Sequence, residues 1–163
     1  MGSSNLLKRI ELHIGESRFC AITPEYIFTS KLINAQFPDY DKLIPRNTPN
    51  TAIASREALK HALTRTSILS NEKFRGIRLQ IDRDLLRIVA NNPEQEEAEE
   101  LIQLDYQGNS LEMGFNAAYL LDVVSAIASE NIRWSFSDSN GGVLMEASGD
   151  EDNSLYVVMP MLL

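Results

Sequence analysis

The chain has 163 residues, of which 23 are acidic and 15 basic, and its formal net charge is −8. That length suits one domain, or one domain and part of another, and provides enough chain to bury a core. A hydrophobic share of 44% and a charged share of 23% indicate a folded chain rather than a disordered one. The acidic balance argues against a protein that coats nucleic acid with its whole surface, so any such contact needs a local basic patch.

Several classes of protein are disfavoured by what the sequence lacks. No apolar run reaches the roughly 20 residues that a membrane span needs, and the N-terminus has no apolar segment of a signal peptide. Cys20 is the only cysteine, which excludes an internal disulfide framework and fits a reducing cytoplasm. His13 and His61 are the only histidines, so we expect no metal site and no cofactor.

The first 34 residues contain three short alternating runs. Leu6–Arg9 is typical of the frayed end of a helix, and the runs that follow predict antiparallel strands. The apolar residues that mark them are Leu12 and Ile14, Phe19 and Ala21, and Tyr26 and Phe28. A β-β-β run without a leading strand and helix predicts that residues 1–34 are the trailing strands of a truncated domain.

Residues 35–49 form the expected connector. Pro38 and Pro45 flank aromatic and aliphatic residues, a composition that favours a stiff linker over a flexible one. Two interpretations remain open. The segment is a linker that packs against the domains it joins, or its apolar side chains line a groove at the junction, where ligand sites often form.

Residues 50–163 are predicted to be one complete domain. The first helix is expected from Ser55 to Ser67, with Ser55 as its cap, and the second from Asn116 to Ser129, with Asn116 as its cap. The surface of the second helix is mostly apolar apart from a stripe of Ala118, Asp122, Ser125 and Ser129.

The remainder alternates with period two, so the order reads β-α-β-β-β twice, over about residues 50–106 and 109–161. The expected fold is therefore α+β, a duplicated unit with both helices on one side of antiparallel sheets.

Catalytic patterns are missing. The sequence has no G-x-S-x-G, P-loop or H-E-x-x-H motif, and Cys20 alternates with Phe19 in a way that favours inert packing. Gly141 and Gly142 predict a turn rather than a phosphate cradle, because no helix begins after them. We therefore expect no enzymatic activity.

Seven blocks along nearly the whole chain form a recognisable pattern. They are Phe28–Leu32, Phe37–Tyr40, Ile68–Gly76, Asn91–Glu100, Gly114–Asn116, Tyr119–Val123 and Tyr156–Met161. These blocks resemble the bacterial β sliding clamp, the processivity subunit of the replicative DNA polymerase. The resemblance implies a ring of two subunits, each with three duplicated domains, around duplex DNA, with residues 50–163 as the complete third domain.

The first helix is the candidate nucleic-acid surface. It carries three basic residues and His61 against one acid, a composition that also suits a solvated helix face. The resemblance implies that Arg56, Lys60 and Arg65 face the phosphates of duplex DNA without reading bases, a contact that is independent of sequence and sensitive to salt.

The C-terminal tail is the candidate protein-binding site. Its methionines suit either core filling or a surface that accepts several partners. The resemblance implies a pocket for short peptide motifs of polymerase, clamp loader and repair proteins. Its residues here are Pro38, Lys42, Leu43, Phe74, Asn116, Tyr119, Asn140, Val157, Val158, Met159, Pro160 and Met161. The chain departs from the family at Leu162, where a basic residue is usual, and at Lys42, where arginine is common.

A further set of residues is the candidate contact with a second subunit. Ile68 and Leu69 follow the first helix and are either an exposed apolar knuckle or ordinary core. The acidic stretch is either a solvated loop leading into a strand or part of that contact, as the resemblance implies. Its residues are Glu94, Glu96, Glu97, Glu99 and Glu100.

The expected function is that of a DNA polymerase processivity factor that tethers replication proteins to duplex DNA. An alternative is a small enzyme or metabolite-binding module that uses the groove between the connector and the C-terminal tail.

Overall fold

The computed structural model describes residues 9–71, 74–149 and 153–162. The chain divides into two compact units, Met1–Pro38 and Asp39–Leu163. No helix in the described ranges is long and apolar enough to cross a lipid bilayer.

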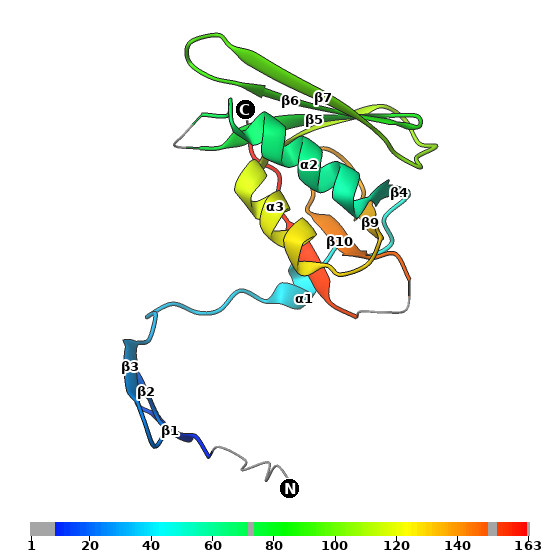
Figure 1. Cartoon of the computed structure of the whole chain (residues 1–163). Helices are drawn as coiled ribbons and strands as arrows, with labels where there is room; N and C mark the ends of the chain where they lie inside the picture. Colours follow the sequence, from blue (N-terminus) through cyan, green and yellow to red (C-terminus); the bar gives the residue numbers. More distant parts are fainter. Residues whose placement is uncertain (1–8, 72–73, 150–152, 163) are drawn as a thin grey trace, which may run out of the picture. The chain divides into compact units, whose positions relative to one another are not determined.

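The N-terminal unit is a three-stranded antiparallel sheet in the order β1-β2-β3 (Figure 1). β1 is Glu11–Ile14, β2 is Arg18–Ile22 and β3 is Ile27–Lys31. The three predicted strands are therefore confirmed. The predicted helix end at Leu6–Arg9 lies outside the described residues except for Arg9, which is not helical.

The second unit opens with a helical turn that the sequence did not predict. α1, Tyr40–Leu43, lies within the stretch expected to be a stiff connector, residues 35–49. The amide of Ile44 donates to the carbonyl of Tyr40 at 3.1 Å and closes the turn. Pro45 follows directly, and its ring and missing N–H prevent the helix from continuing.

The rest of the unit follows the predicted order. The first half consists of β4 (Asn50–Ser55), α2 (Arg56–Ser67), β5 (Gly76–Asp82), β6 (Leu85–Asn91) and β7 (Glu97–Gln103). The second half consists of β8 (Leu111–Asn116), α3 (Ala117–Ala126), β9 (Asn131–Phe136), β10 (Val143–Ala147) and β11 (Leu155–Val158). The duplicated β-α-β-β-β pattern is confirmed.

The two halves exchange their first strands. One four-stranded sheet has the order β7-β6-β5-β8, and the other has the order β11-β10-β9-β4. Each three-stranded meander therefore gains its fourth strand from the other half. β5 pairs β8 from Gly76 opposite Asn116, and β4 pairs β9 from Asn50 opposite Phe136. Neither half can complete its sheet alone.

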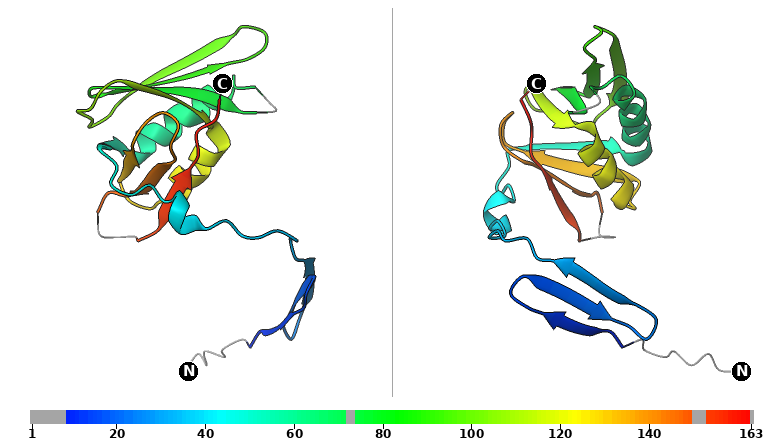
Figure 2. Two further views of the ribbon diagram at one scale, coloured as in Figure 1. Left: turned by 180° about the vertical axis from the view of Figure 1, so that it is seen from behind. Right: turned by 90° about the vertical axis from the view of Figure 1, so that its left-hand side faces the viewer.

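Both helices lie side by side on one side of the sheets, as the right-hand view of Figure 2 shows. Each helix buries one face against the sheets. α2 buries Leu59, Ala62, Leu63 and Thr66, and α3 buries Ala117, Leu120, Val123 and Val124. Inward-facing strand residues complete the core, including Trp134, Phe136 and Phe115, which are fully buried.

The starts of both helices match the prediction. The Ser55 hydroxyl accepts from the amide of Ala58 at 3.5 Å, and the Asn116 side chain accepts from the amide of Ala118 at 2.9 Å. Each cap is the last residue of the preceding strand. This places each helix directly after the strand that crosses to the other half.

The predicted end of the second helix at Ser129 is wrong, because α3 ends at Ala126. Ile127 adopts an extended conformation and is 1% exposed, so the chain leaves the helix to bury this side chain. The Ser129 hydroxyl then donates to the carbonyl of Asn131 at 2.6 Å, and the Ser129 carbonyl accepts from Arg56 Nε at 3.0 Å. Ser129 is therefore buried and does not extend the polar stripe.

We expect truncation of a core side chain in the sheet β7-β6-β5-β8 to destabilise the second unit. Leu79→Ala in β5 removes a side chain that is 0% exposed, so the free energy of unfolding should fall by about 2–5 kcal/mol. Leu101→Ala in β7 removes a side chain that is 55% exposed and should cost less than about 1 kcal/mol. Urea unfolding followed by the fluorescence of Trp134, the chain's single tryptophan, measures both. Equal losses would contradict the assigned core.

Candidate functional site

An apolar cleft lies between α3 and β11. It has a volume of about 380 Å³ and is lined by Tyr119, Asp122, Val123, Val157, Val158 and Met159. Tyr119 is 61% exposed and Met159 is 53% exposed. Val158 and Val123 are buried and form the inner wall. We refer to it as the α3–β11 cleft.

The helical wall of the cleft is set by the cap at Asn116. Because the cap fixes where α3 begins, Tyr119 falls on its outer face, while Leu120 points into the core. Asp122 and Val123 lie three and four residues after Tyr119, and such spacing places side chains on the same face of a helix. Sequence reasoning left both out of the candidate set, although this spacing from Tyr119 could have found them.

The strand wall is set by the pairing of β11 with β10. Val143 lies opposite Val158, and Leu144 lies opposite Val157. Pro160, which has no amide hydrogen, follows Met159 and ends the ladder. The amide of Met161 then donates to the carbonyl of Gly114 in β8 at 2.9 Å. The tail is thereby tied to the other sheet.

Gly142 permits a close approach behind the strand wall. A Cβ atom at this position would lie 3.0 Å from the Met159 sulfur, 3.1 Å from Val157 Cγ1 and 3.9 Å from the carbonyl oxygen of Leu43. A larger residue would push Val157 or Met159 outward. Leu43 of α1 therefore belongs to the same neighbourhood as the strand wall.

The turn before Gly142 is held by Asp138. Its carboxylate accepts from the amides of Asn140 at 2.8 Å and Gly141 at 2.9 Å. These two backbone bonds lower the pKa of Asp138 from its ordinary value, because they favour the charged form. The Asp138 carboxylate is therefore charged at neutral pH and accepts both backbone bonds of the turn.

The predicted peptide-binding residues divide into groups. Four of them line the α3–β11 cleft, namely Tyr119, Val157, Val158 and Met159. Asn140 and Met161 instead line a smaller hollow of about 210 Å³ together with Arg78 and Glu112.

The remaining members of the set do not line the cleft. Phe74 is 55% exposed, and Pro160 follows the strand wall. Lys42 Nζ is held by Asp39 at 3.0 Å. Pro38 is the last residue of the other compact unit.

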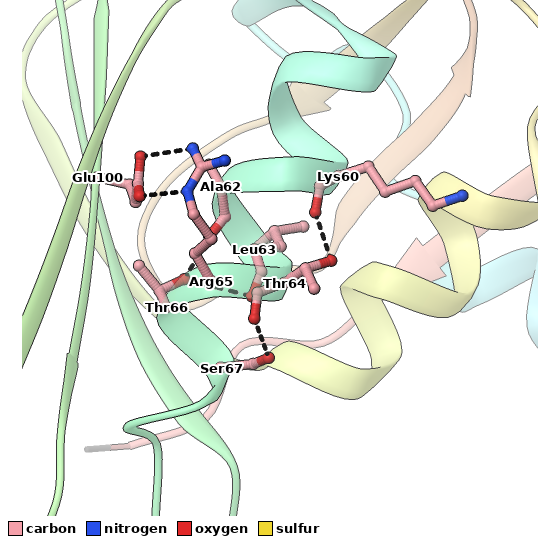
Figure 3. Close-up of polar contacts among 8 residues, drawn as sticks. All are labelled: Lys60, Ala62, Leu63, Thr64, Arg65, Thr66, Ser67 and Glu100. Carbon is pink, nitrogen blue, oxygen red and sulfur yellow. Dashed lines mark hydrogen bonds and ion pairs between the residues drawn. The ribbon is translucent and has the colours of Figure 1, made fainter.

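Two of the three predicted DNA-facing cations of α2 are paired with other groups of the same chain. Arg65 makes a two-point ion pair with Glu100 of β7, at 2.5 Å from Nε and 2.8 Å from the other guanidinium nitrogen (Figure 3). Arg56 donates to the carbonyl of Ser129 and pairs with Glu57 at 2.5 Å. In the described part of the chain the Lys60 ammonium has no ion-pair partner, and Figure 3 shows it pointing away from the Arg65–Glu100 pair.

The acidic stretch does not form a simple loop. Glu97, Glu99 and Glu100 lie within β7, at the edge of its sheet. Glu99 pairs with Arg87 at 2.5 Å. Glu96 closes a turn with Asn92, whose side-chain amide donates to it at 2.7 Å. Glu94 lines a shallow hollow of about 440 Å³ with Ile68 and Leu69.

Ile68 is not a core residue. It is 77% exposed, whereas Leu69 is half-buried. Ile68 also borders a second hollow, of about 680 Å³, which lies between the end of α2 and the start of α3. Its lining is mixed, with Arg75 and Asp122 among serines and aliphatic residues. Asp122 thus stands between this hollow and the α3–β11 cleft.

These features define a class of protein. A doubled fold with two helices on one side, and a surface cleft lined by aliphatic and aromatic side chains, is the architecture of a clamp domain. Comparison with protein families matches residues 41–162 to the DNA polymerase III beta subunit, C-terminal domain. The chain belongs to this family, the bacterial β sliding clamps.

Individual relatives support the same family assignment. The chain is 50% identical to the beta sliding clamp of Pseudomonas putida over 154 residues, which cover 94% of this chain and 42% of the relative. The DNA polymerase sliding clamp of Pseudomonas aeruginosa, solved with a ligand, has a TM-score of 0.80 at 48% identity over 98% of this chain and 43% of that one. A second structure of that clamp, bound to griselimycin, has a TM-score of 0.77 at the same identity and coverage. The chain thus spans less than half the length of these relatives.

We expect the Arg65–Glu100 pair to show in the titration of Glu100. The hydrogen bonds from Arg65 lower the pKa of Glu100 below its ordinary value of 4.5. The pair's contribution to stability is therefore fully present above pH 4.5 and is lost as the pH falls through the lowered pKa. In Arg65→Gln the pKa should rise towards the ordinary value, as measured by NMR of the glutamate carboxyl carbons. An unchanged pKa in this variant would contradict the pair.

Proposed function

We propose that this chain serves as the C-terminal part of a sliding clamp, a non-catalytic tether that keeps polymerase and other replication proteins at duplex DNA. Membership of the family and the match to clamp structures over 98% of the chain support the proposal. Retention by a ring is topological, so each contact with a partner can be weak. The observation on which the proposal depends most is the α3–β11 cleft.

The cleft suits an apolar peptide side chain. Its walls are valines and a methionine, with an exposed tyrosine at the mouth, and among the described lining residues Asp122 alone has a carboxylate. Methionine adapts to different guests, which suits a surface that accepts several partners. A linear segment with a Gln-Leu-x-Leu-Phe pattern would place leucine and phenylalanine side chains in this cleft.

The two positions at which the chain departs from the family supply no free positive charge. Lys42 is held by Asp39 at 3.0 Å, and Leu162, which is 97% exposed, occupies the position where the family usually has a basic residue. Asp122 adds a negative charge at the wall. Apolar anchoring should be retained, while acidic residues flanking the motif should be disfavoured.

The alternative of a small enzyme or metabolite-binding module has less support. None of the cleft's described lining residues is a histidine or cysteine, so the lining offers no nucleophile–base pair of the usual kind. Peptide titration separates the two functions, because a metabolite site has no reason to recognise the leucine and phenylalanine of a linear motif.

The proposed contact with DNA is weak and independent of sequence. Lys60 is the α2 cation with no ion-pair partner in the described residues, while Arg56 and Arg65 are engaged by Glu57 and Glu100. A ring that slides must avoid tight or base-specific contacts. A helix face whose charge is mostly neutralised from within suits this requirement.

The proposed contact with a second subunit uses Ile68 and the β7 edge. An exposed isoleucine beside a hollow, next to an edge strand rich in glutamate, favours a partner surface that is apolar and basic. The resemblance assigns this role to the first domain of another subunit.

We expect Tyr119→Ala to weaken peptide binding by roughly tenfold or more, since exposed aromatic residues at the mouth of a pocket carry much of the binding energy. Tyr26→Ala is the matched control, because Tyr26 is 74% exposed in the other unit, and it should change affinity less than twofold. Fluorescence anisotropy of a labelled Gln-Leu-x-Leu-Phe peptide measures both variants. A wild-type chain that does not bind, or binds equally well when leucine and phenylalanine are replaced by alanine, would contradict the proposal.

We expect two charge changes, one on α2 and one on the neighbouring strand β7, to move DNA affinity in opposite directions. Lys60→Gln removes the unpaired cation and should weaken binding to duplex DNA, whereas Glu100→Gln frees Arg65 and should strengthen it. The logarithm of the binding constant should fall with the logarithm of salt concentration, with a small slope. Arg83→Gln, in the exposed turn between β5 and β6, controls for net charge. Salt-insensitive or sequence-selective binding would refute this contact.

A further inference from the structure

Two surface hollows of the second unit share one residue. The α3–β11 cleft and the hollow between the end of α2 and the start of α3, which we call the α2–α3 hollow, are both lined by Asp122. Tyr119 and Val123 of α3 belong to the cleft, whereas Ala118 and Leu121 belong to the α2–α3 hollow. The first two turns of α3 therefore separate the two hollows, and Asp122 stands where they meet.

Arg75 lines the α2–α3 hollow from the loop that precedes β5. Its φ of 47° is left-handed, a conformation that few residues other than glycine adopt. Backbone bonds on both sides hold it there, since its amide donates to the carbonyl of Asn71 at 2.7 Å and its carbonyl accepts from the amide of Ala117 at 2.8 Å. Strained conformations that the surrounding structure holds in place cluster at functional sites. The fold therefore fixes the position of Arg75 beside the start of α3.

Arg75 and Asp122 line the same hollow and do not pair with one another. Neither has an ion-pair partner among the residues that the structure describes, and both are exposed. Most other arginines of the second unit are paired with a carboxylate, namely Arg46, Arg56, Arg65, Arg78, Arg87 and Arg133. Two opposite charges that do not neutralise each other are both available to a guest in the hollow.

The rest of the described lining leaves Arg75 as the donor for a carboxylate. The hydroxyls of Ser67 and Ser70 already donate, to the carbonyl of Thr64 at 2.9 Å and to the carbonyl of Ser67 at 2.7 Å. A hydroxyl has one hydrogen, so these two groups can only accept from a guest. One cation, one carboxylate and two acceptors suit a guest chain that carries both an acidic and a basic side chain.

We propose that the cleft and the α2–α3 hollow form one extended site for a linear segment of a partner protein, and that this site recognises the order of charges beside the apolar anchor. The basic residue of the segment lies next to the anchor and meets Asp122, which borders the cleft. The acidic residue lies farther along and meets Arg75, which lines only the α2–α3 hollow. This inference rests on the proposed function, because the anchor must first occupy the cleft.

Electrostatics favours this order of charges over its reverse. A segment with the acid next to its anchor would bring two carboxylates together at Asp122 and two cations together at Arg75. Like charges repel where opposite charges attract, so reversing the order changes the sign of both contacts. Nucleic acid fits the α2–α3 hollow less well, because the Asp122 carboxylate would repel phosphates held by Arg75.

Peptides of one composition test the order. The Gln-Leu-x-Leu-Phe peptide is extended at either end by a lysine next to the motif and a glutamate one to three residues farther, or by the same two residues exchanged. For one of the two ends the lysine-proximal peptide should bind the full 163-residue chain about tenfold more tightly, as measured by fluorescence anisotropy. Both peptides have the same net charge, so long-range attraction contributes equally.

The outcomes separate this inference from the proposed function. Equal affinities for both charge orders at both ends, or a preference for the reverse order, would overturn the inference alone if the unextended peptide still binds. Failure of every peptide to bind would overturn the proposed function and this inference with it.

Charge exchange in the protein gives a second test. Asp122→Lys combined with Arg75→Glu should invert the preference, whereas a misfolded chain would lose binding to both peptides. Asp122→Asn and Arg75→Gln should each reduce the preference about threefold, since each removes one of the two contacts. Glu16→Gln and Arg83→Gln are matched controls, because they remove the same charges at exposed turns, and they should leave the preference unchanged. No inversion, or an equal loss in the controls, would overturn the inference.

Duplex DNA is the competing occupant of Arg75. If Arg75 meets phosphates, Arg75→Gln should weaken DNA binding as much as Lys60→Gln does and leave the peptide preference unchanged. We expect the opposite result, in which Arg75→Gln reduces the peptide preference and changes DNA affinity less than Lys60→Gln at the same salt concentration. A loss of DNA affinity with an unchanged peptide preference would overturn the inference.

Discussion

The exchange of first strands between the two halves is the constraint on which the domain depends. β8 leaves the second half to complete the sheet of β5, β6 and β7, and β4 leaves the first half to complete the other sheet. Each crossing strand ends in a helix cap, Ser55 or Asn116, so the same strands that join the sheets also determine where both helices begin. The helices must then lie side by side.

The pseudo-symmetry of the two halves extends to a backbone contact at the end of each half. Ile53 of β4 exchanges backbone hydrogen bonds with Asp105, just past the last strand of its own half, at 3.0 and 2.8 Å. In the second half the equivalent tie runs from Met161 to Gly114 of β8. That tie holds the tail against β8 after Met159, while Val157 and Val158 of β11 line the cleft beside α3. The position of the cleft is therefore a consequence of how the second half closes.

Much of the fold could be predicted from the sequence, because the strands, the helix starts and the duplication depend on local patterns of residues. Alternation predicts the strands, the caps predict where the helices begin, and the repeated order predicts the duplication. The predictions that were wrong or missing depend on contacts between residues far apart in the chain. The end of α3 is set by the burial of Ile127 and by the Arg56–Ser129 bond, which joins residues far apart in the chain. The pairing of Arg65 with Glu100 likewise could not be inferred from the helix alone.

The residues of the cleft likewise divide into those that were predicted and those that were missed. Resemblance supplied Tyr119 and the β11 residues that line the cleft, while Asp122 and Val123 were missed because the candidate set was matched position by position rather than by helix face. The role of Gly142 is visible only in three dimensions, since its neighbours Val157, Met159 and Leu43 come from other segments.

The central claim is that the α3–β11 cleft is where an apolar peptide binds. The most direct measurement is an NMR titration of the isotope-labelled chain with a Gln-Leu-x-Leu-Phe peptide, which locates binding residue by residue. The account predicts that the amides of Tyr119, Val123 and Val157–Met159 shift together and saturate. Shifts confined to the hollow between Ile68 and Glu94, or none at all, would contradict it.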